Sequence, residues 1–109
     1  MDNYHKASKE RKKLIEKLLI GAVDLHCHSG PSVMPRSIDH IEVAKEASKV
    51  GMKAVLYKDH YYSATPVTEL LNKHFSQLNV KLLSGVPLNN TVGGTVSYTH
   101  LTLPTILLV

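Results

Sequence analysis

The sequence predicts an α/β fold built from parallel strands. Three short apolar runs, at residues 22–28, 53–58 and 80–84, have the length and the polar boundaries expected of buried strands. Amphipathic segments with a helical period separate them, and strands that alternate with helices of roughly 10–15 residues indicate βαβ units and a parallel sheet. A composition of 43% hydrophobic and 20% charged residues excludes wholesale disorder, and a single cysteine excludes an internal disulfide framework.

Residues 1–20 are predicted to form an amphipathic helix ahead of this pattern, which Gly21 ends. Six bases and three acids in residues 1–18 give this segment a charge of +3, out of +4 for the whole chain. Its apolar residues are expected to dock on the body of the protein and to leave the bases in solvent. They are Leu14, Ile15, Leu18 and Leu19. Binding to a polyanion or a membrane surface is the alternative, although a nucleic-acid binder usually carries a broader basic stripe.

The next two helices have recognisable starts and stops. Ser37 is expected to cap the second helix, with Asp39 in its first turn, and Gly51 to end it. Thr65 and Pro66 provide a cap and a first helical position for the third helix, where the missing proline N–H costs nothing. The apolar period of the second helix runs through Ile38, Ile41, Ala44 or Lys45, Ala47 and Val50.

The last residues depart from this composition. Residues 96–109 contain no charged side chain, whereas the average of the chain predicts about three. The stretch from Val96 to Thr105 resembles the in-frame translation of a transposase adapter used in preparing sequencing libraries. We therefore expect residues 96–109 to be non-native and the natural protein to continue differently after Thr95; an ordinary C-terminal strand is the alternative. His100, which lies in this stretch, receives no functional role.

Two histidines lie on the first predicted strand. Side chains alternate between the faces of a strand, so the apolar face, expected to pack beneath the helices, contains Val23, Leu25 and Cys27. The other face contains Asp24, His26 and His28. Alternate residues of a strand have Cα atoms about 6.5–7 Å apart, which lets two imidazoles converge on one ion with bonds of about 2.0–2.1 Å to zinc. Asp24 is placed to accept the second N–H of a ligating imidazole.

Residues 24–32, with the sequence Asp-Leu-His-Cys-His-Ser-Gly-Pro-Ser, resemble the first-strand signature of the amidohydrolase superfamily of metal-dependent hydrolases. Residues 35–37, 58–60 and 88–94 look like motifs of an uncharacterised amidohydrolase-like family, and the similarity runs from about Leu19 to Gly94. The resemblance implies a distorted (β/α)8 barrel with its helices outside, in which residues 21–95 form the first three β/α units. Such barrels need about 250 residues, so this chain is expected to be an N-terminal fragment.

In that superfamily the His-x-His pair binds the metal, which assigns His26 and His28 as ligands, and further ligands come from later strands. The resemblance implies a divalent ion, zinc first with manganese or iron as alternatives. It also implies attack of water on an amide, ester, lactone or phosphoester of a small-molecule substrate. The chain by itself is expected to be inactive. The alternatives are a phosphoesterase fragment of the polymerase-and-histidinol-phosphatase family and a small non-enzymatic α/β module with a structural or adventitious ion.

Loops that follow the strands form the active face of such barrels, which makes four further residues candidates. His60 could bind metal, transfer a proton or contact substrate, or be an ordinary loop histidine. Lys58 and Arg36 could hold an anionic group of the substrate or be solvated, and Asn89 could face the site or form a turn. Three other histidines are expected on exposed helix faces without a functional role: His5, His40 and His74.

Location and partners are also suggested by the sequence. No apolar run reaches the roughly 18 residues of a membrane span, and the charged N-terminus lacks the apolar core of a secretion signal. We therefore expect a cytoplasmic protein that binds neither nucleic acid nor membrane. Three parallel strands would leave an open edge and uncovered apolar surface, so the chain is expected to self-associate or aggregate.

Overall fold

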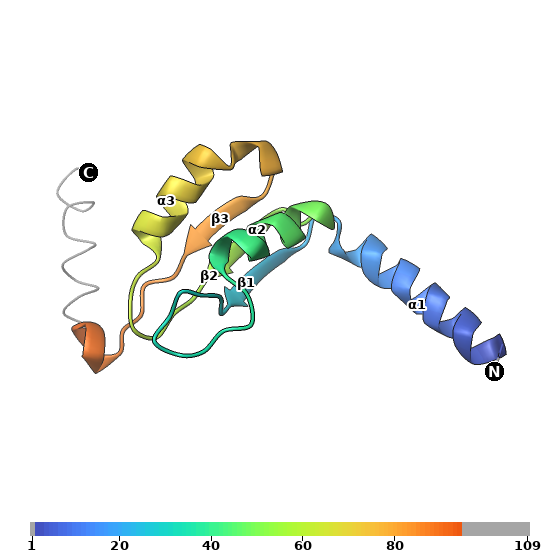
Figure 1. Cartoon of the computed structure of the whole chain (residues 1–109), viewed down its shortest axis with the longest axis horizontal. Coiled ribbons are helices and arrows are strands. Elements are labelled where there is room, and N and C mark those ends of the chain that lie inside the picture. Colours follow the sequence, from blue (N-terminus) through green and yellow to red (C-terminus); the bar gives the residue numbers. More distant parts are fainter. Residues whose placement is uncertain (1, 95–109) are drawn as a thin grey trace.

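A computed structural model describes residues 2–94 and shows alternating helices and strands (Figure 1). In chain order the elements are α1 (Asp2–Leu19), β1 (Val23–Cys27), α2 (His40–Lys49), β2 (Ala54–Tyr57), α3 (Thr65–His74) and β3 (Lys81–Ser84). Two short 3-10 helices follow α3 and β3, at Ser76–Leu78 and Asn90–Val92. The predictions for residues 96–109, His100 among them, lie outside the described residues.

The three strands form one parallel sheet in the order β1-β2-β3. β2 and β3 pair in regular register, with Ala54 opposite Lys81 and Tyr57 opposite Ser84. A helix connects each strand to the next, as parallel strands require. The predicted α/β fold with three parallel strands is confirmed for this part of the chain.

The core lies between the sheet and the two helices that follow β1 and β2. Val55 and Tyr57 from β2 are 2% and 1% exposed, and they belong to one buried cluster with side chains from both α2 and α3. The helix side chains in that cluster are Val43, Ala44, Ala47 and Leu71. Full burial of a Val or Leu side chain contributes about 1.5–3 kcal/mol, so this cluster is the main apolar stabilisation of the fold. Both helices therefore pack on the same face of the sheet.

The outer edge of β3 is covered by a side chain from α3. Asn72 Nδ2 donates to the Leu82 carbonyl oxygen at 2.8 Å, and Asn72 Oδ1 accepts from the Leu82 N–H at 3.0 Å. Lys81 and Gly85 donate toward β2, to the carbonyls of Lys53 and Tyr57, and the alternation along a strand turns the Leu82 peptide groups the other way. The Asn72 amide thus pairs with this edge much as a neighbouring strand would.

The predicted faces of β1 are wrong for three of its residues, because the strand contains an irregularity. Asp24 lies opposite Val55 and Cys27 opposite Tyr57, so three steps along β1 match two along β2. The extra residue reverses the alternation: Asp24 and Cys27 both line the groove against α2, while Val23 and Leu25 are 48% and 66% exposed. Cys27 packs against the core as predicted, whereas Val23 and Leu25 do not lie beneath the helices.

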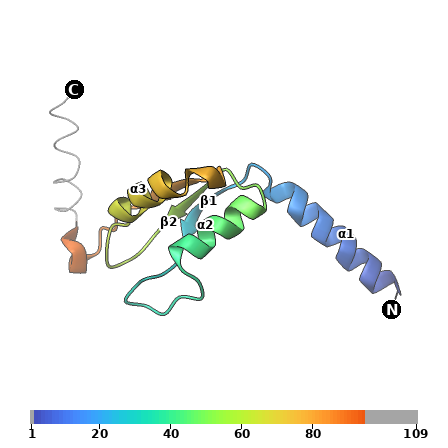
Figure 2. The same cartoon turned by 45° about the horizontal axis from the view of Figure 1, so that its top comes forward.

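The N-terminal helix does not dock on the body of the protein. Figures 1 and 2 both show α1 extending away from the sheet and its helices. Its apolar residues Leu14 and Leu18 remain 56% and 68% exposed, so the predicted packing of this face is wrong. The chain enters β1 through Gly21, which has a φ of 75° and donates to the Gly51 carbonyl. No helix within residues 2–94 has the length and apolar character needed to cross a bilayer.

The N-cap of α2 lies two residues later in the chain than predicted. Asp39, not Ser37, is the N-cap: its Oδ1 accepts from the Glu42 N–H at 2.7 Å, and Glu42 Oε1 accepts from the Asp39 N–H at 3.3 Å. This reciprocal capping box satisfies two backbone donors. The hydrogen bond from the Glu42 N–H also lowers the pKa of Asp39 below its usual value. Ile38 and Ile41 are 39% and 37% exposed, so they lie off the buried face of the helix.

α3 begins close to its predicted start. The N-cap is Ala64, which places Thr65 inside the helix, and Pro66 lies in the first turn, where its missing N–H has no intrahelical partner to lose.

The end of α2 agrees with the prediction. Gly51 follows α2 with a φ of 80°, in the left-handed region that a glycine adopts readily, as expected for the end of a helix.

Candidate functional site

The structure brings His26 and His28 together at the carboxyl end of β1. Their Nε2 atoms are 2.9 Å apart, and the ring centroids are 4.8 Å apart with an interplanar angle of 70°. Cys27 between them packs against the core, so the two imidazoles lie on the side away from the helices. The convergence of the two rings, expected from their spacing, is present. Their role as metal ligands stays a prediction.

The strand irregularity has a direct connection to this pair. Asp24 Oδ1 accepts a hydrogen bond of 2.9 Å from the backbone N–H of His26. An extra residue in a strand leaves a peptide group out of register with the neighbouring strand, and the Asp24 carboxylate provides a partner for one such N–H. Asp24 therefore orients the backbone that carries His26. The bond predicted from an imidazole to Asp24 stays a prediction, because the interaction seen uses the His26 backbone.

The Nε2 atoms of His26 and His28 lie at hydrogen-bond distance from each other. Two nitrogen ligands at about 2.0–2.1 Å from a tetrahedral ion are about 3.3 Å apart, close to the 2.9 Å between the Nε2 atoms. His28 Nδ1 is buried without a hydrogen-bond partner among the described residues. Within residues 2–94 no group of three or more His, Cys, Asp or Glu side chains is arranged to hold an ion. This part of the chain thus offers two nitrogen donors.

His60 and Asn89 extend the site across the other two strands. His60 follows β2, and its ring stacks on that of His28 with centroids 5.3 Å apart and an interplanar angle of 23°. Asn89 follows β3; its Nδ2 donates to the His60 carbonyl at 2.9 Å and lies 3.4 Å from His60 Nδ1. The carboxyl ends of all three strands therefore contribute to one cluster. His60 and Asn89 both lie in this cluster, and their chemical roles stay predictions.

Between β2 and His60 lie two charged residues with different surroundings. The Lys58 N–H donates to the Cys27 carbonyl at 2.8 Å and its side chain is half-buried. Asp59 is 3% exposed, and its Oδ1 accepts from the Tyr61 N–H at 2.8 Å. Burial acts to raise the pKa of Asp59, but the Ser32 hydroxyl, the Tyr61 N–H and the nearby positive charges outweigh burial and hold the pKa below its usual value. Asp59 is therefore a buried carboxylate beside the histidines, and no role was predicted for it individually.

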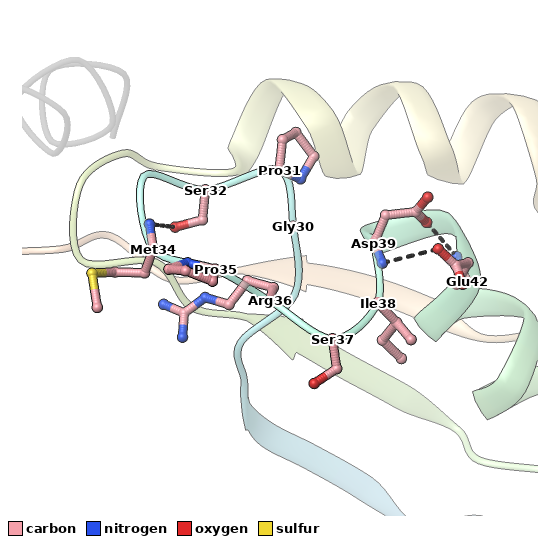
Figure 3. Close-up of a pocket in the computed structure, with 10 residues that line it drawn as sticks. All are labelled: Gly30, Pro31, Ser32, Met34, Pro35, Arg36, Ser37, Ile38, Asp39 and Glu42. Carbon is pink, nitrogen blue, oxygen red and sulfur yellow. Dashed lines mark hydrogen bonds between the residues drawn. The ribbon is translucent and has the colours of Figure 1, made fainter.

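The loop between β1 and α2 lines an open pocket of about 530 Å³. Figure 3 shows Arg36 among its lining residues, together with the capping pair Asp39 and Glu42. The Arg36 side chain packs over Gly30, its Nε is buried without a hydrogen-bond partner among the described residues, and its charge lowers the pKa of Asp59. This pocket does not include the histidine cluster among its lining residues. The predicted contacts of Arg36 and Lys58 with an anionic substrate stay predictions.

His40 is buried, which corrects the prediction of an exposed position. It is 4% exposed; its Nδ1 lies 2.6 Å from Ser29 Oγ and its Nε2 lies 2.6 Å from the Tyr62 hydroxyl. Burial lowers the pKa of His40, although the charges of Asp39 and Asp59 act in the opposite direction. The missed signal was the helical period itself, because His40 shares one face of α2 with Val43, Ala44 and Ala47. His5 and His74 are exposed as predicted.

Residues 21–100 match a protein family of unknown function, DUF6282. The chain belongs to this family. The DUF6282 match contains all three strands and the helices between them, and it includes the strand-end residues His26, His28, His60 and Asn89. No curated protein and no solved structure matches the chain.

Proposed function

We propose that this DUF6282 chain carries the N-terminal β/α units of a metal-dependent hydrolase of the amidohydrolase type, in which His26 and His28 hold one divalent ion. The observation that carries the proposal is the 2.9 Å separation of the two Nε2 atoms at the carboxyl end of β1. The carboxyl ends of parallel strands are where active sites of α/β barrels are built. The stacking of His60, from the next strand, on His28 adds a second strand end to the same place.

The arrangement of layers supports a barrel as the parent fold. The strands follow one another in the order β1-β2-β3, and α2 and α3 pack on one face only. A doubly wound sheet carries helices on both faces, whereas a (β/α)8 barrel carries them on the outside alone. Val23 and Leu25 on the opposite face are exposed here, and in a closed barrel that face would be filled by side chains of further strands.

The proposed roles of the residues follow from their positions. A divalent ion supplies Lewis acidity, which lowers the pKa of a water molecule to about 7 and polarises a carbonyl or phosphoryl oxygen. His26 and His28 offer imidazole nitrogens as ligands, and Asp24 accepts a hydrogen bond from the backbone N–H of His26. His60, held by Asn89, is placed to hold or transfer a proton next to His28.

The substrate class is a compound with an amide, ester, lactone or phosphoester bond. Lys58 and Arg36 near the strand ends would attract an anionic part of such a substrate, with Arg36 able to bind a carboxylate or phosphate by two parallel hydrogen bonds. The described part of the chain offers two nitrogen donors, and catalytic zinc sites commonly use three protein ligands. We therefore expect this chain to bind an ion weakly and to need ligands from further strands for turnover.

Calorimetric titration of the chain with Zn2+ tests the proposal. Wild-type protein is expected to bind one ion, and His26→Ala and His28→Ala are each expected to lose that binding. His74→Ala is the matched control, because it removes an exposed histidine from the last turn of α3 and not from the carboxyl end of β1. Equal binding by wild type and His26→Ala would rule out the proposed ion site.

A further inference from the structure

A chain of hydrogen bonds that is buried at Ser29 and His40 and exposed at Pro31 links the loops that follow β1 and β2. Ser29 Oγ lies 2.6 Å from His40 Nδ1, His40 Nε2 lies 2.6 Å from the Tyr62 hydroxyl, and that hydroxyl donates to the Pro31 carbonyl at 2.7 Å. Ser29 is 1% exposed and His40 4% exposed. We call this set the Ser29–His40–Tyr62 chain. It occupies the space between α2 and the loops that follow β1 and β2.

The donor and the acceptor of each hydrogen bond in the Ser29–His40–Tyr62 chain can be assigned. Because the Tyr62 hydroxyl donates its proton to the Pro31 carbonyl, it accepts from His40 Nε2–H. Burial lowers the pKa of His40 and favours the neutral imidazole, in which the other ring nitrogen, Nδ1, accepts from the Ser29 hydroxyl. His40 is thus a neutral imidazole with both nitrogens satisfied. The Tyr57 hydroxyl donates to the His40 carbonyl at 2.6 Å and ties the same residue to β2.

The ends of the Ser29–His40–Tyr62 chain are close in sequence to His28 and His60, whose imidazoles stack. Ser29 directly follows His28, and Tyr62 is two residues after His60. The rings of His28 and His60 belong to different strand ends, which are joined through β1–β2 pairing, the Lys58–Cys27 backbone hydrogen bond and the interaction of the Ser32 hydroxyl with Asp59. The Ser29–His40–Tyr62 chain is a further connection between the two loops, beyond the ends of the strands.

We propose that His40 is a positioning residue that, through Ser29 and Tyr62, sets the placement of the His28 imidazole relative to that of His60. Buried polar groups stabilise a fold little unless every partner is satisfied, and a fully satisfied network selects one geometry. An apolar side chain at position 40 would fill the same volume without joining the two loops. The consequence for metal binding rests on the proposed function, whereas the placement of the rings does not.

Tyr62→Phe is the sharpest variant, because it keeps the ring and removes the hydroxyl that both accepts from His40 and donates to Pro31. In metal-free protein, imidazole resonances of His28 and His60 are expected to shift relative to wild type in 1H–15N spectra. Tyr61→Phe is the matched control: it removes a hydroxyl from an exposed tyrosine directly beside His60. Val43→Ala, a core change on α2, controls for loss of stability alone. Both controls are expected to leave these resonances in place.

The same proteins titrated with Co2+ separate the inference from the proposed function. Tyr62→Phe is expected to weaken Co2+ binding about tenfold and to alter the visible absorption bands, while Val43→Ala lowers the unfolding temperature and leaves the Co2+ affinity unchanged. Unchanged His28 and His60 resonances in Tyr62→Phe would overturn the positioning role. Absence of Co2+ binding by wild type would overturn the proposed function, and the metal-free spectra would still decide whether His40 positions the two rings.

Discussion

Tyr57 lies at the centre of the core, and its hydroxyl is the group whose removal is most informative about the fold. The residue is 1% exposed and donates to the His40 carbonyl at 2.6 Å. A net hydrogen bond contributes about 0.5–1.5 kcal/mol, so Tyr57→Phe is expected to lower the free energy of unfolding by about 1 kcal/mol at pH 7. The change keeps the ring that packs against His40, with centroids 4.7 Å apart.

Alkaline pH should reverse this order of stability. Burial, with nearby Cys27 and Asp39, raises the pKa of Tyr57 well above its usual value, so the folded protein keeps the phenolic proton after the unfolded chain has lost it. The neutral Tyr57 phenol contributes fully to the free energy of unfolding below about pH 10. As the pH rises further, this contribution falls by about 1.4 kcal/mol per pH unit. Near pH 11 the loss equals or exceeds the 1 kcal/mol advantage, so wild type and Tyr57→Phe are expected to cross in stability.

Urea unfolding at several pH values between 7 and 11 measures the difference in the free energy of unfolding between wild type and Tyr57→Phe. Titrations shared by both cancel in the difference, which leaves the contribution of position 57. Tyr61→Phe controls for loss of a tyrosine at an exposed position. A gap that stays constant from pH 8 to pH 11 would refute the reasoning that Tyr57 is buried as a neutral phenol.

Other features of the fold give further expectations. Asn72→Ala should lower the free energy of unfolding by about 1–3 kcal/mol, because two hydrogen bonds to Leu82 are lost. Lys73→Ala, at the exposed neighbouring position, is the control. Equal urea midpoints for Asn72→Ala and wild type would contradict this expectation. The full chain should elute from gel filtration as oligomers, since Leu25 and the apolar face of α1 are exposed, and a monomer with cooperative melting would argue against an incomplete barrel. Purified chain with Zn2+ should show no hydrolysis; turnover that disappears in His26→Ala would contradict the need for further ligands.

The periodic features of the sequence predicted the structure well. Helical spacing and short apolar runs predicted the helices, the strands and their parallel arrangement, because these patterns follow directly from which side chains are buried. The spacing of His26 and His28 predicted that their imidazoles converge, which holds because both flank Cys27 at the end of β1. Parallel strand ends meet at one edge, which is why His60 joins them.

Features that depend on a local departure from regularity were not predictable in this way. The extra residue in β1 turns Leu25 outward and Asp24 toward α2, and nothing in the alternation of polar and apolar residues reveals it. The helical period places His40 on the buried face of α2, but its hydrogen-bond partners Ser29 and Tyr62 are distant in sequence and were not predictable. The path of α1 away from the sheet (Figure 1) leaves Leu14 and Leu18 exposed, and the helical period of the segment gives no sign of it.

Asn72 has a consequence for how this sheet could grow. A fourth strand joining β3 in parallel would need the Leu82 peptide groups that the Asn72 amide now engages. Addition of such a strand would replace the two hydrogen bonds from the Asn72 amide to Leu82 with hydrogen bonds from the strand's own backbone. The number of hydrogen bonds at Leu82 would therefore change little. In the described part of the chain, Asn72 keeps the Leu82 peptide groups at the β3 edge paired.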